Sequence, residues 1–222
     1  MIRLAGVDLV PHLSGALHAP GYDCLLVADL HFEKGSNFAA RGQHLPPYDT
    51  RATLAGLKAA LAAFSPRRLI LLGDSFHDGD AESRIHADDM EMIRAMTSVH
   101  QVIWVTGNHD MELPRGLGGT VVDGLEMGPL RLVHIPSRPD GRAEIAGHLH
   151  PVAAITQRGR RLRRRCFVGN GERLVLPAFG AYAGGLNVLA EPFAPIFPRA
   201  DFTAHMIGAR GVHAFPAAKL SA

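Results

Sequence analysis

The sequence predicts an α/β protein built as a four-layer αββα sandwich, in which two mixed β-sheets stack face to face. In the first half of the chain, short apolar runs alternate with two segments of helical periodicity. In the second half, short apolar runs are separated by Gly and Pro, and no helical segment of similar length follows. Because no Ser/Gly-rich linker separates the halves, we expect one domain over residues 1–222.

The strands predicted in the first half cover residues 25–27, 69–72 and 102–105. A helix is predicted between the first two strands, with Asp49 as its expected N-cap and Ser65-Pro66 as its end. Its apolar side chains recur at steps of three and four residues: Leu54, Leu57, Leu61 and Phe64. That spacing places them on one face, which we expect to pack on a sheet.

A second helix is predicted over residues 82–98, where apolar side chains share one side and charged side chains the other. After Gly116 the chain changes to short strands. The strands predicted there cover residues 120–122, 130–134, 152–156, 165–168 and 173–176. These strands are expected to form the second sheet of the sandwich.

Composition limits the classes of protein that the chain can belong to. It is 47% hydrophobic and 20% charged, with no apolar run near the ~18 residues that span a bilayer. Charges interrupt the N-terminal residues where a signal peptide would be apolar, and two cysteines, Cys24 and Cys166, make no disulfide framework. We therefore expect a globular protein of the cytoplasm without membrane association. The net charge of +2 is too small to indicate nucleic acid by itself.

Side chains that can bind metal gather in short clusters, three of which follow predicted strands. The clusters are Asp29-Leu30-His31, Gly73-Asp74, Gly107-Asn108-His109-Asp110 and Gly147-His148-Leu149-His150, with His134 between the last two. Strand ends in an open α/β sheet are where functional groups are placed. The set predicts one binuclear metal site.

The spacing within the clusters suggests how the cations are held. Asp29 and His31 are two residues apart at the end of an extended run, so both side chains are expected on one face, where they can chelate one cation. His148 and His150 repeat this spacing. Asp74 follows a glycine that lets the backbone turn, and its two carboxylate oxygens can bridge two cations.

Asn108 adds a neutral oxygen ligand, and the position of His134 between two clusters makes it a further expected ligand. A mixture of imidazole, carboxylate and amide favours Mn, Fe or Zn over Ca or Mg, and the absence of thiolates argues against a structural zinc. Two divalent cations with the carboxylates of Asp29 and Asp74 leave a net positive site. Such a site attracts phosphate and stabilises the transition state of phosphoester hydrolysis.

His109 is expected to have a different function from its neighbour Asn108. On an extended backbone its side chain points away from that ligand, so it is free to face the substrate. It can act there as the general acid to the leaving oxygen or as a charge stabiliser, with Asp110 as a candidate orienting partner.

Basic residues are concentrated in one segment. Six of the 23 Lys and Arg residues lie in residues 158–165. This segment is either a solvated hairpin tip or a surface that contacts phosphates, and the arginines expected to bind nucleic acid are Arg160, Arg161, Arg163, Arg164 and Arg165.

The ordered clusters resemble the motifs of the calcineurin-like metallophosphoesterase superfamily, D-x-H, G-D-x-x-D, G-N-H-D/E, a strand-end His and G-H-x-H. The resemblance implies that fold, and it implies a first metal held by Asp29, His31, Asp74 and His150. It implies a second metal held by Asp74, Asn108, His134 and His148, with His109 as the catalytic histidine. His77 stands where many members carry an acid, and it either touches the scissile phosphate or orders Asp74.

A narrower resemblance covers nearly the whole chain. Residues 73–78, 147–151 and 166–188 are similar to the bacterial ligase-associated DNA-damage-response endonucleases. This implies a manganese-dependent phosphodiesterase that acts on DNA, mainly single-stranded, in association with a repair helicase and a DNA ligase. The glycines of residues 177–185 either serve a tight loop or shape a substrate channel.

The resulting hypothesis is a DNA endonuclease of DNA repair, in which a hydroxide that bridges two metal ions, most readily Mn, attacks the phosphodiester. His109 and His77 are the expected catalytic residues, supported by Asp110. One alternative is a small-molecule phosphodiesterase or phosphomonoesterase that uses the same site. A second alternative is a non-catalytic scaffold of a repair complex, although a scaffold does not require His109 or Asn108.

Overall fold

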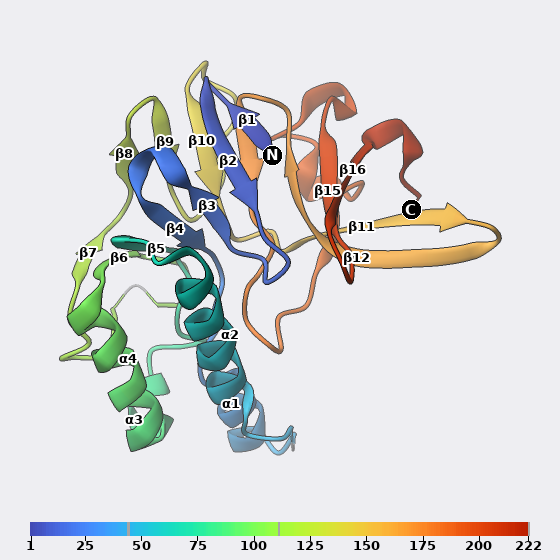
Figure 1. Ribbon diagram of the computed structural model, residues 1–222. Coiled ribbons are helices and arrows are strands. Elements are labelled where there is room, and N and C mark those ends of the chain that lie inside the picture. Colours follow the sequence, from blue (N-terminus) through green and yellow to red (C-terminus); the bar gives the residue numbers. More distant parts are fainter. Residues whose placement is uncertain (44, 111, 222) are drawn as a thin grey trace.

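The computed structural model describes residues 1–43, 45–110 and 112–221, which form two stacked β-sheets (Figure 1). In the first sheet the strands lie side by side in chain order. They are β1 Ile2–Leu4, β2 Val7–Pro11, β3 Leu17–Ala19, β4 Cys24–Val27, β5 Arg68–Leu72, β6 Gln101–Val105 and β7 Thr120–Val122. Strands β4 to β7 are parallel, whereas β1 to β4 pair antiparallel. The carboxyl ends of β4, β5 and β6 therefore meet at one edge.

The second sheet has the order β14-β11-β12-β13-β10-β9-β8, with the hairpin β15–β16 attached to β12. Its strands are β8 Leu125–Met127, β9 Leu130–Leu132, β10 Ala143–Ala146, β11 Pro151–Gln157, β12 Arg160–Gly169, β13 Arg173–Val175, β14 Leu186–Asn187, β15 Thr203–Ile207 and β16 Val212–Pro216. Strand β10 is parallel to both of its neighbours, while β11 and β12 are antiparallel. Both sheets are therefore mixed, as the sequence predicts.

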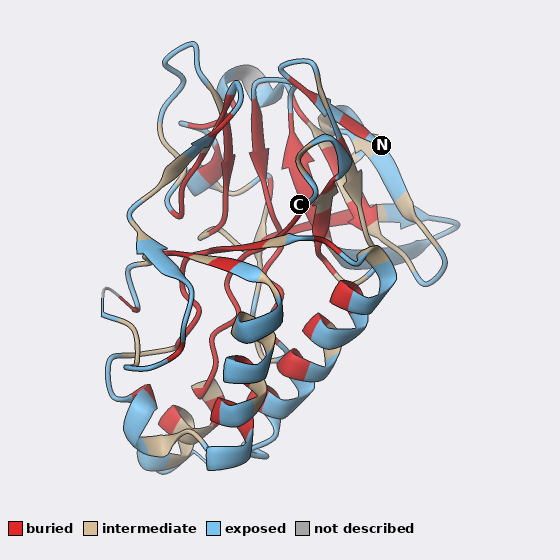
Figure 2. Cartoon of the chain, turned by 60° about the vertical axis from the view of Figure 1, so that its left-hand side comes forward, coloured by how far each residue is buried: buried red, intermediate tan, exposed pale blue. Residues whose placement is uncertain are grey.

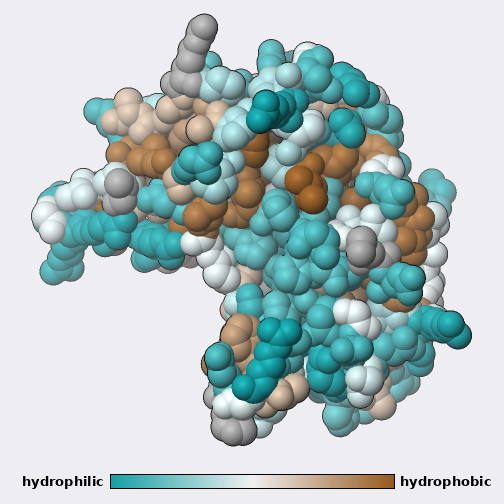
Figure 3. All heavy atoms as spheres, turned by 180° about the vertical axis from the view of Figure 1, so that it is seen from behind, coloured by the Kyte–Doolittle hydropathy of each residue, from teal (hydrophilic) through white to brown (hydrophobic). Residues whose placement is uncertain are grey.

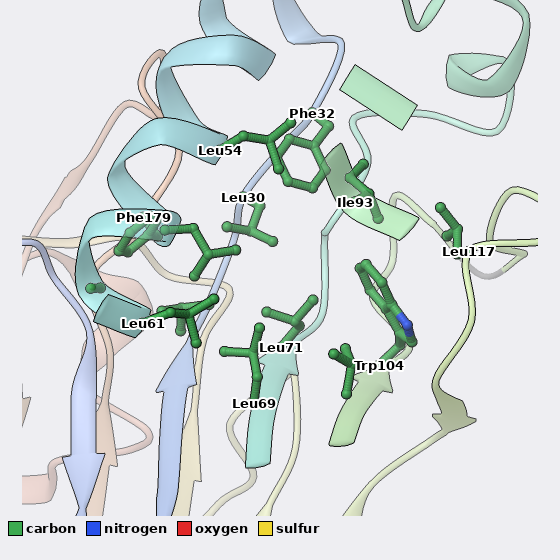
Figure 4. Packing of buried hydrophobic residues seen from close by; sticks show 14 of the residues in the cluster. Leu30, Phe32, Leu54, Leu61, Leu69, Leu71, Ile93, Trp104, Leu117 and Phe179 are labelled. Carbon is green, nitrogen blue, oxygen red and sulfur yellow. The ribbon is translucent and has the colours of Figure 1, made fainter. Parts of the chain in front are cut away.

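The described residues form four α-helices, α1 Lys34–Ala40, α2 Asp49–Phe64, α3 Ala81–Arg84 and α4 Ala87–Val99. Of these, α2 and α4 cover the outer face of the first sheet, and Figure 2 shows that each of these longer helices buries one side. Leu54 and Leu61 of α2 pack over Leu69, Leu71 and Trp104 of the strands (Figure 4). No helix in the described part of the chain is long and apolar enough to cross a membrane.

A second core lies between the sheets. Because side chains alternate along a strand, Leu26 of β4 and Ile70 of β5 point away from the helices. They are fully buried against Leu132, Ile145 and Phe167 of the second sheet. Residues from both halves of the sequence therefore share this core, and the predicted sandwich of two mixed sheets is confirmed.

The outer face of the second sheet is covered by the C-terminal part of the chain. Its 3-10 helices η2 Glu191–Phe193 and η3 Pro198–Ala200 bring Phe193 and Phe197 onto Cys166 and Val168 of β12. Within the described residues this outer layer is built from short 3-10 helices and loops, so it is thinner than the layer of α-helices on the first sheet.

The helix boundaries differ from the predicted ones in two places. Asp49 is the first residue of α2, not its N-cap, because its carboxylate accepts a hydrogen bond from the Gly35 amide at 3.0 Å, which joins α1 to α2. The helix predicted over residues 82–98 is two helices, because His86 adopts an extended backbone and its ring accepts the Asp88 amide as the cap of α4. The short helix α1 and the strands β1 to β3, β8, β10 and β14 to β16 were not predicted, since their patterns are only a few residues long.

Candidate metal centre

The first ligands lie in tight turns just beyond the strand ends. Asp29, His31 and Asp74 have positive φ angles of 56°, 46° and 47°. This left-handed conformation costs roughly 1–2 kcal/mol for a residue with a side chain. Hydrogen bonds hold it in place, since the Asp29 amide donates to Gly73 O at 3.2 Å and the His31 amide to Asp74 O at 2.9 Å. The expectation of an extended backbone at residues 29–31 was therefore wrong, although both side chains reach the same group.

Asp29, His31 and His150 form the first group of metal-capable side chains, with ligand atoms within 4.8 Å of one another. The two Nε2 atoms of the histidines lie 3.1 Å apart, and His150 Nε2 lies 3.4 Å from Asp29 Oδ1. Two ligand atoms at ~2.1 Å from one cation and at right angles to each other would be separated by about 3 Å. The group therefore has the dimensions of a cation site.

Asp74, His134 and His148 form the second group. His134 Nε2 lies 3.3 Å from Asp74 Oδ1, 3.2 Å from His148 Nδ1 and 3.0 Å from Asn108 Oδ1. The other oxygen of Asp74, Oδ2, lies 4.0 Å from His31 Nε2 in the first group. The Asp74 carboxylate thus stands between the groups, where a bridging ligand belongs, and all seven predicted ligand residues come together.

His148 and His150 divide between the two groups, which is the division that the family resemblance implies, whereas their spacing alone suggested that they share one cation. The prediction assumed an extended chain, in which side chains two residues apart point the same way. Both residues instead have positive φ angles, 71° and 46°. The His148 amide donates to both carboxylate oxygens of Asp29, at 3.1 and 3.0 Å, which fixes the turn between the groups.

The protonation states of Asp74 and His31 suit metal binding. At His134 burial would lower the pKa, but the hydrogen bond to Asp74 and the charge of that carboxylate raise it, so a cation bound there has to displace a proton. Burial alone would raise the pKa of Asp74, but hydrogen bonding to His134 and the charge of that ring lower it to about 2. Burial and the neighbouring charge of His150 lower the pKa of His31 to about 3. His134 Nδ1 donates to Leu72 O at 3.0 Å, which leaves Nε2 facing the second group. Ionised carboxylates and neutral imidazoles are the forms that coordinate a cation.

The glycines of the motifs allow this close packing. A Cβ atom at Gly73 would overlap the His134 ring, and one at Gly107 would overlap the amide and carboxylate of Asp74. Each group combines one carboxylate with two imidazoles, a donor set that fits a divalent cation such as Mn, Fe or Zn. The residues present therefore fit two cations.

His109 lies outside both groups but faces them. Its side chain is 42% exposed, and Nε2 lies 4.0 Å from Asp74 Oδ2. Its amide donates to Asp74 Oδ1 at 2.9 Å, and its Nδ1 donates to the carbonyl oxygen of His77 at 2.9 Å. The hydrogen bond at Nδ1 thus fixes the orientation of the ring, which remains accessible to solvent at the edge of the two ligand groups.

Asp110 does not orient His109, in contrast to the prediction. Its buried carboxylate accepts hydrogen bonds from four backbone amides, those of Gly107, Asp74, Ser75 and Phe76. Burial raises the pKa of Asp110 to about 6 in spite of these donors. Asp110 joins the loops after β5 and β6, and the carbonyl of His77 orients His109 instead.

His77 is the middle ring of a three-ring stack. Its centroid lies 5.3 Å from that of His109 and 6.1 Å from that of Phe38 on α1, with interplanar angles of 16° and 19°. Burial, followed by the charges of Lys34 and His109, lowers the pKa of His77 to about 4. Phe38 and Lys34 were not predicted to lie at the site, and their spacing of four residues is the only signal for them in the sequence.

The Arg-rich segment runs from the turn of the β11–β12 hairpin back along β12, and this hairpin projects from the body of the molecule (Figure 1). We call residues 157–164 of this hairpin the Arg arm. Arg160, Arg161, Arg163 and Arg164 are exposed. Arg165 does not belong with them, because its guanidinium turns inward and donates to Ala178 O at 2.8 Å, and burial lowers its pKa. The assignment of Arg165 to the nucleic-acid surface is therefore corrected.

The loop of residues 178–186 connects the Arg arm with the metal ligands. The Gly180 amide donates to Asp29 O at 3.1 Å, and the Leu186 amide donates to His150 O at 3.0 Å. Arg163 of the arm donates to Gly185 O at 2.6 Å. A Cβ at Gly180 would overlap the carbonyl of Leu30, so this glycine serves close packing against a ligand loop.

Residues 23–170 match the family model described as calcineurin-like phosphoesterase, and the chain belongs to this family. The family consists of hydrolases that act on phosphoesters with divalent metals, in agreement with the two ligand groups. Among solved structures, the chain is similar to the nuclease MPE of Pseudomonas putida, with 30% identity and a TM-score of 0.73 over 96% of this chain and 98% of that chain.

Two other solved structures are more distant. The protein AQ665 of Aquifex aeolicus is 18% identical, with a TM-score of 0.40 over 57% of this chain and 78% of that chain. The phosphoesterase Yfce of E. coli is 16% identical, with a TM-score of 0.44 over 87% of this chain and 98% of that chain. No curated protein matches the sequence.

Proposed function

We propose that the protein is a binuclear metal-dependent phosphodiesterase that acts as a DNA endonuclease, with single-stranded DNA as its substrate. The observation that carries the proposal is the preformed pair of ligand groups that share Asp74, with His109 facing them from outside. The likeness to the Pseudomonas putida nuclease over nearly the whole of both chains supports the choice of a nucleic acid.

In this proposal Asp29, His31, Asp74 and His150 hold one cation, and Asp74, Asn108, His134 and His148 hold the other. When bound, the two cations supply Lewis-acid stabilisation of the phosphate and lower the pKa of water. Manganese is the proposed metal, and the same donors suit Fe or Zn. Chelation, followed by reconstitution with one metal at a time, tests this choice, because Mn should restore the highest turnover.

His109 is the proposed general acid. Its Nδ1 already donates to the His77 carbonyl, so protonation of Nε2 makes an imidazolium that the carbonyl oxygen stabilises. Nε2 then gives its proton to the leaving oxygen, and the ring returns to the neutral form with Nδ1–H still bound. His77 acts through its carbonyl and its stacking contact, and Asp110 acts only by holding the loops.

The Arg arm supports DNA over a small substrate. Five exposed arginines project beyond the body, since Arg158 adds to the four predicted ones, and Arg163 reaches the loop that packs on the ligands Asp29 and His150. A strand whose scissile phosphate lies at the metals can therefore continue along the arm, where its phosphates meet guanidinium groups. A small diester would reach none of them.

The decisive experiment uses circular single-stranded DNA, a bis-aryl phosphate and an aryl monophosphate, each with Mn, Fe, Zn, Mg or no metal. We expect Mn-dependent linearisation of the circle, which only an endonuclease can produce. If the monoester is hydrolysed faster than either diester, the alternative of a small-molecule phosphomonoesterase is correct. If no metal supports any cleavage, the alternative of a non-catalytic scaffold is favoured.

The proposed setting is DNA repair in the cytoplasm, in association with a repair helicase and a DNA ligase. The similarity of residues 73–78, 147–151 and 166–188 to the ligase-associated endonucleases supports this proposal. Size-exclusion chromatography of the purified chain mixed with each candidate partner tests it. Separate elution at concentrations in the micromolar range would contradict a stable association.

A further inference from the structure

Helix α1 presents a cationic and aromatic face next to the catalytic histidine. Lys34, Phe38 and the C-cap residue Arg41 are spaced by four and three residues, which places them on one side of the helix. We call these three residues the α1 face. The helix begins three residues after the ligand His31, and the Lys34 amide donates to His31 O at 3.3 Å. The α1 face therefore starts at the metal centre.

The three-ring stack places the α1 face beside the proposed general acid, His109. Phe38 stacks on His77, and His77 stacks on His109, so Phe38 is separated from the proposed general acid by a single ring. Phe38 is itself half-buried. A nucleotide next to the scissile phosphate would be within reach of this ring.

The two cations of the α1 face are not neutralised. The positive charge of Lys34 acts on His31 and His77, and that of Arg41 acts on His77, where each lowers the pKa of the imidazole. In the described part of the chain, neither side chain makes an ion pair or a hydrogen bond. Lys34 is also partly buried, and burial lowers its pKa. A bound anion would offset the unfavourable effect of burial on the Lys34 charge.

The neighbouring carboxylates are already bonded to other groups. Asp49 accepts the Gly35 amide, Asp78 accepts Arg84 at 2.7 and 2.6 Å, and Glu33 accepts the Thr50 hydroxyl at 2.8 Å. The charge of Asp49 acts on Lys34 but makes no direct ion pair with it. The charges of Lys34 and Arg41 are consequently left without a directly paired carboxylate among the described residues.

We propose that the α1 face binds the DNA strand beside the scissile phosphodiester, with Lys34 and Arg41 at phosphates and Phe38 at a base. This inference rests on the proposed DNA substrate. Residues seven apart on a helix are separated by about 10 Å along its axis. In a duplex, successive phosphates of one strand are separated by ~3.4 Å along the helix axis. The two cations can therefore contact different phosphates, and an aromatic ring between them suits a base.

The α1 face and the Arg arm would hold the strand at two places. The α1 face follows the ligand His31 in the chain, and β11 of the arm follows the ligand His150, which is in the same group. Seen from behind, the arm and the lobe of helices project from the body with a recess between them (Figure 3). A strand bound on both sides of the metals is cut internally, as an endonuclease requires.

The test compares the double variant Lys34→Gln/Arg41→Gln with Lys58→Gln, an exposed lysine of α2 that faces α4. On a single-stranded oligonucleotide, kcat/KM of the double variant should fall about tenfold, mainly through KM. The slope of log(kcat/KM) against log[salt] should decrease by about 1.4, since each single-strand phosphate contact contributes ~0.7. Turnover of the bis-aryl phosphate should stay within about twofold, as it should for Lys58→Gln on both substrates.

A second variant tests the base contact. Phe38→Leu should slow cleavage of an intact oligonucleotide by on the order of tenfold, because base–aromatic stacking is lost. A set of oligonucleotides, each with one abasic nucleotide next to the cleavage site, should include one on which Phe38→Leu and the wild type are equal. An equal loss on every member of the set would show that Phe38 acts only through His77, and would refute the base contact.

The outcomes separate this inference from the function on which it rests. If the wild type cuts DNA and the double variant keeps the wild-type salt slope, the α1 face does not bind phosphates, and the DNA function stands. If the double variant loses both substrates equally, its effect passes through the metal centre, and the inference is wrong. If the wild type cuts only aryl phosphates with every metal, the DNA function and this inference both fail.

Discussion

His109 is the residue whose position separates catalysis from metal binding. Its ring lies outside both ligand groups, and its Nε2 is 4.0 Å from the Asp74 carboxylate. We expect His109→Asn to lower kcat for a diester by about 10²- to 10⁴-fold, the usual contribution of a general acid. Manganese stoichiometry and affinity, measured by calorimetry, should be those of the wild type. An unchanged kcat would refute the role, and a lost metal would make His109 a ligand.

Asp110 shows how a single side chain can determine the geometry of two loops. Its two oxygens accept four backbone amides, so Asp110→Asn turns an NH₂ group toward donors that then lack an acceptor. We expect the free energy of unfolding to fall by about 2–4 kcal/mol. Urea unfolding in the presence of a chelator measures it. The control Asp123→Asn, at an exposed residue bonded to the Thr106 hydroxyl, should change it by less than about 0.5 kcal/mol.

At the scale of elements, the β11–β12 hairpin combines an anchored base with an exposed tip. Arg165 at the base donates to Ala178 O, whereas Arg160 at the tip and Arg164, which pairs with Ala153 near the base, are exposed. Arg160→Gln/Arg164→Gln should weaken DNA cleavage and reduce the salt slope by about 1.4, and turnover of bis-aryl phosphate should not change. Arg165→Gln should instead lower the melting temperature. Equal losses on DNA and on the small diester would indicate a folding defect in the double variant.

At the scale of the whole molecule, the metal centre joins the two sheets. Asp29 and Asp74 follow strands of the first sheet, while His134 and His150 flank strands of the second. We expect Mn at 100 times its Kd to raise the free energy of unfolding by about 2.7 kcal/mol per site. For a chain of this size, the melting temperature should rise by about 2–4 °C for each kcal/mol. For Asp74→Asn, which removes the shared ligand, the increase in melting temperature measured by calorimetry should be less than half of the wild-type increase.

We further propose that the chain unfolds as one domain, because the core between the sheets takes residues from both halves. Trp104, the single tryptophan, reports on the first sheet. Cys166, buried in the second sheet, reports on that sheet by thiol labelling in a Cys24→Ala variant. The two probes should give the same urea midpoint. Midpoints that differ beyond the error of measurement would mean two independent units.

The sequence by itself predicted the residues that the structure brings together as two metal-capable groups, and the chemistry that such groups support. Asp29, Asp74 and Asn108 follow apolar runs that are parallel neighbours in the first sheet, so strand ends alone bring them together. The nature of the donors then selects divalent metals and phosphoesters. Apolar runs and helical periodicity likewise predicted the strands β4, β5 and β6 and the helix α2, because those patterns depend only on neighbours in the chain.

The tertiary structure decided where the individual side chains point. His148 and His150 separate because left-handed turns, stabilised by contacts with Asp29 and other distant residues, replace the extended chain that the spacing suggested. Asp110 and Arg165 turn inward because backbone groups from other segments offer hydrogen bonds. The α1 face emerged in the same way, since the stack of Phe38 on His77 joins residues 39 positions apart. Such contacts depend on packing between distant segments, which no local pattern encodes.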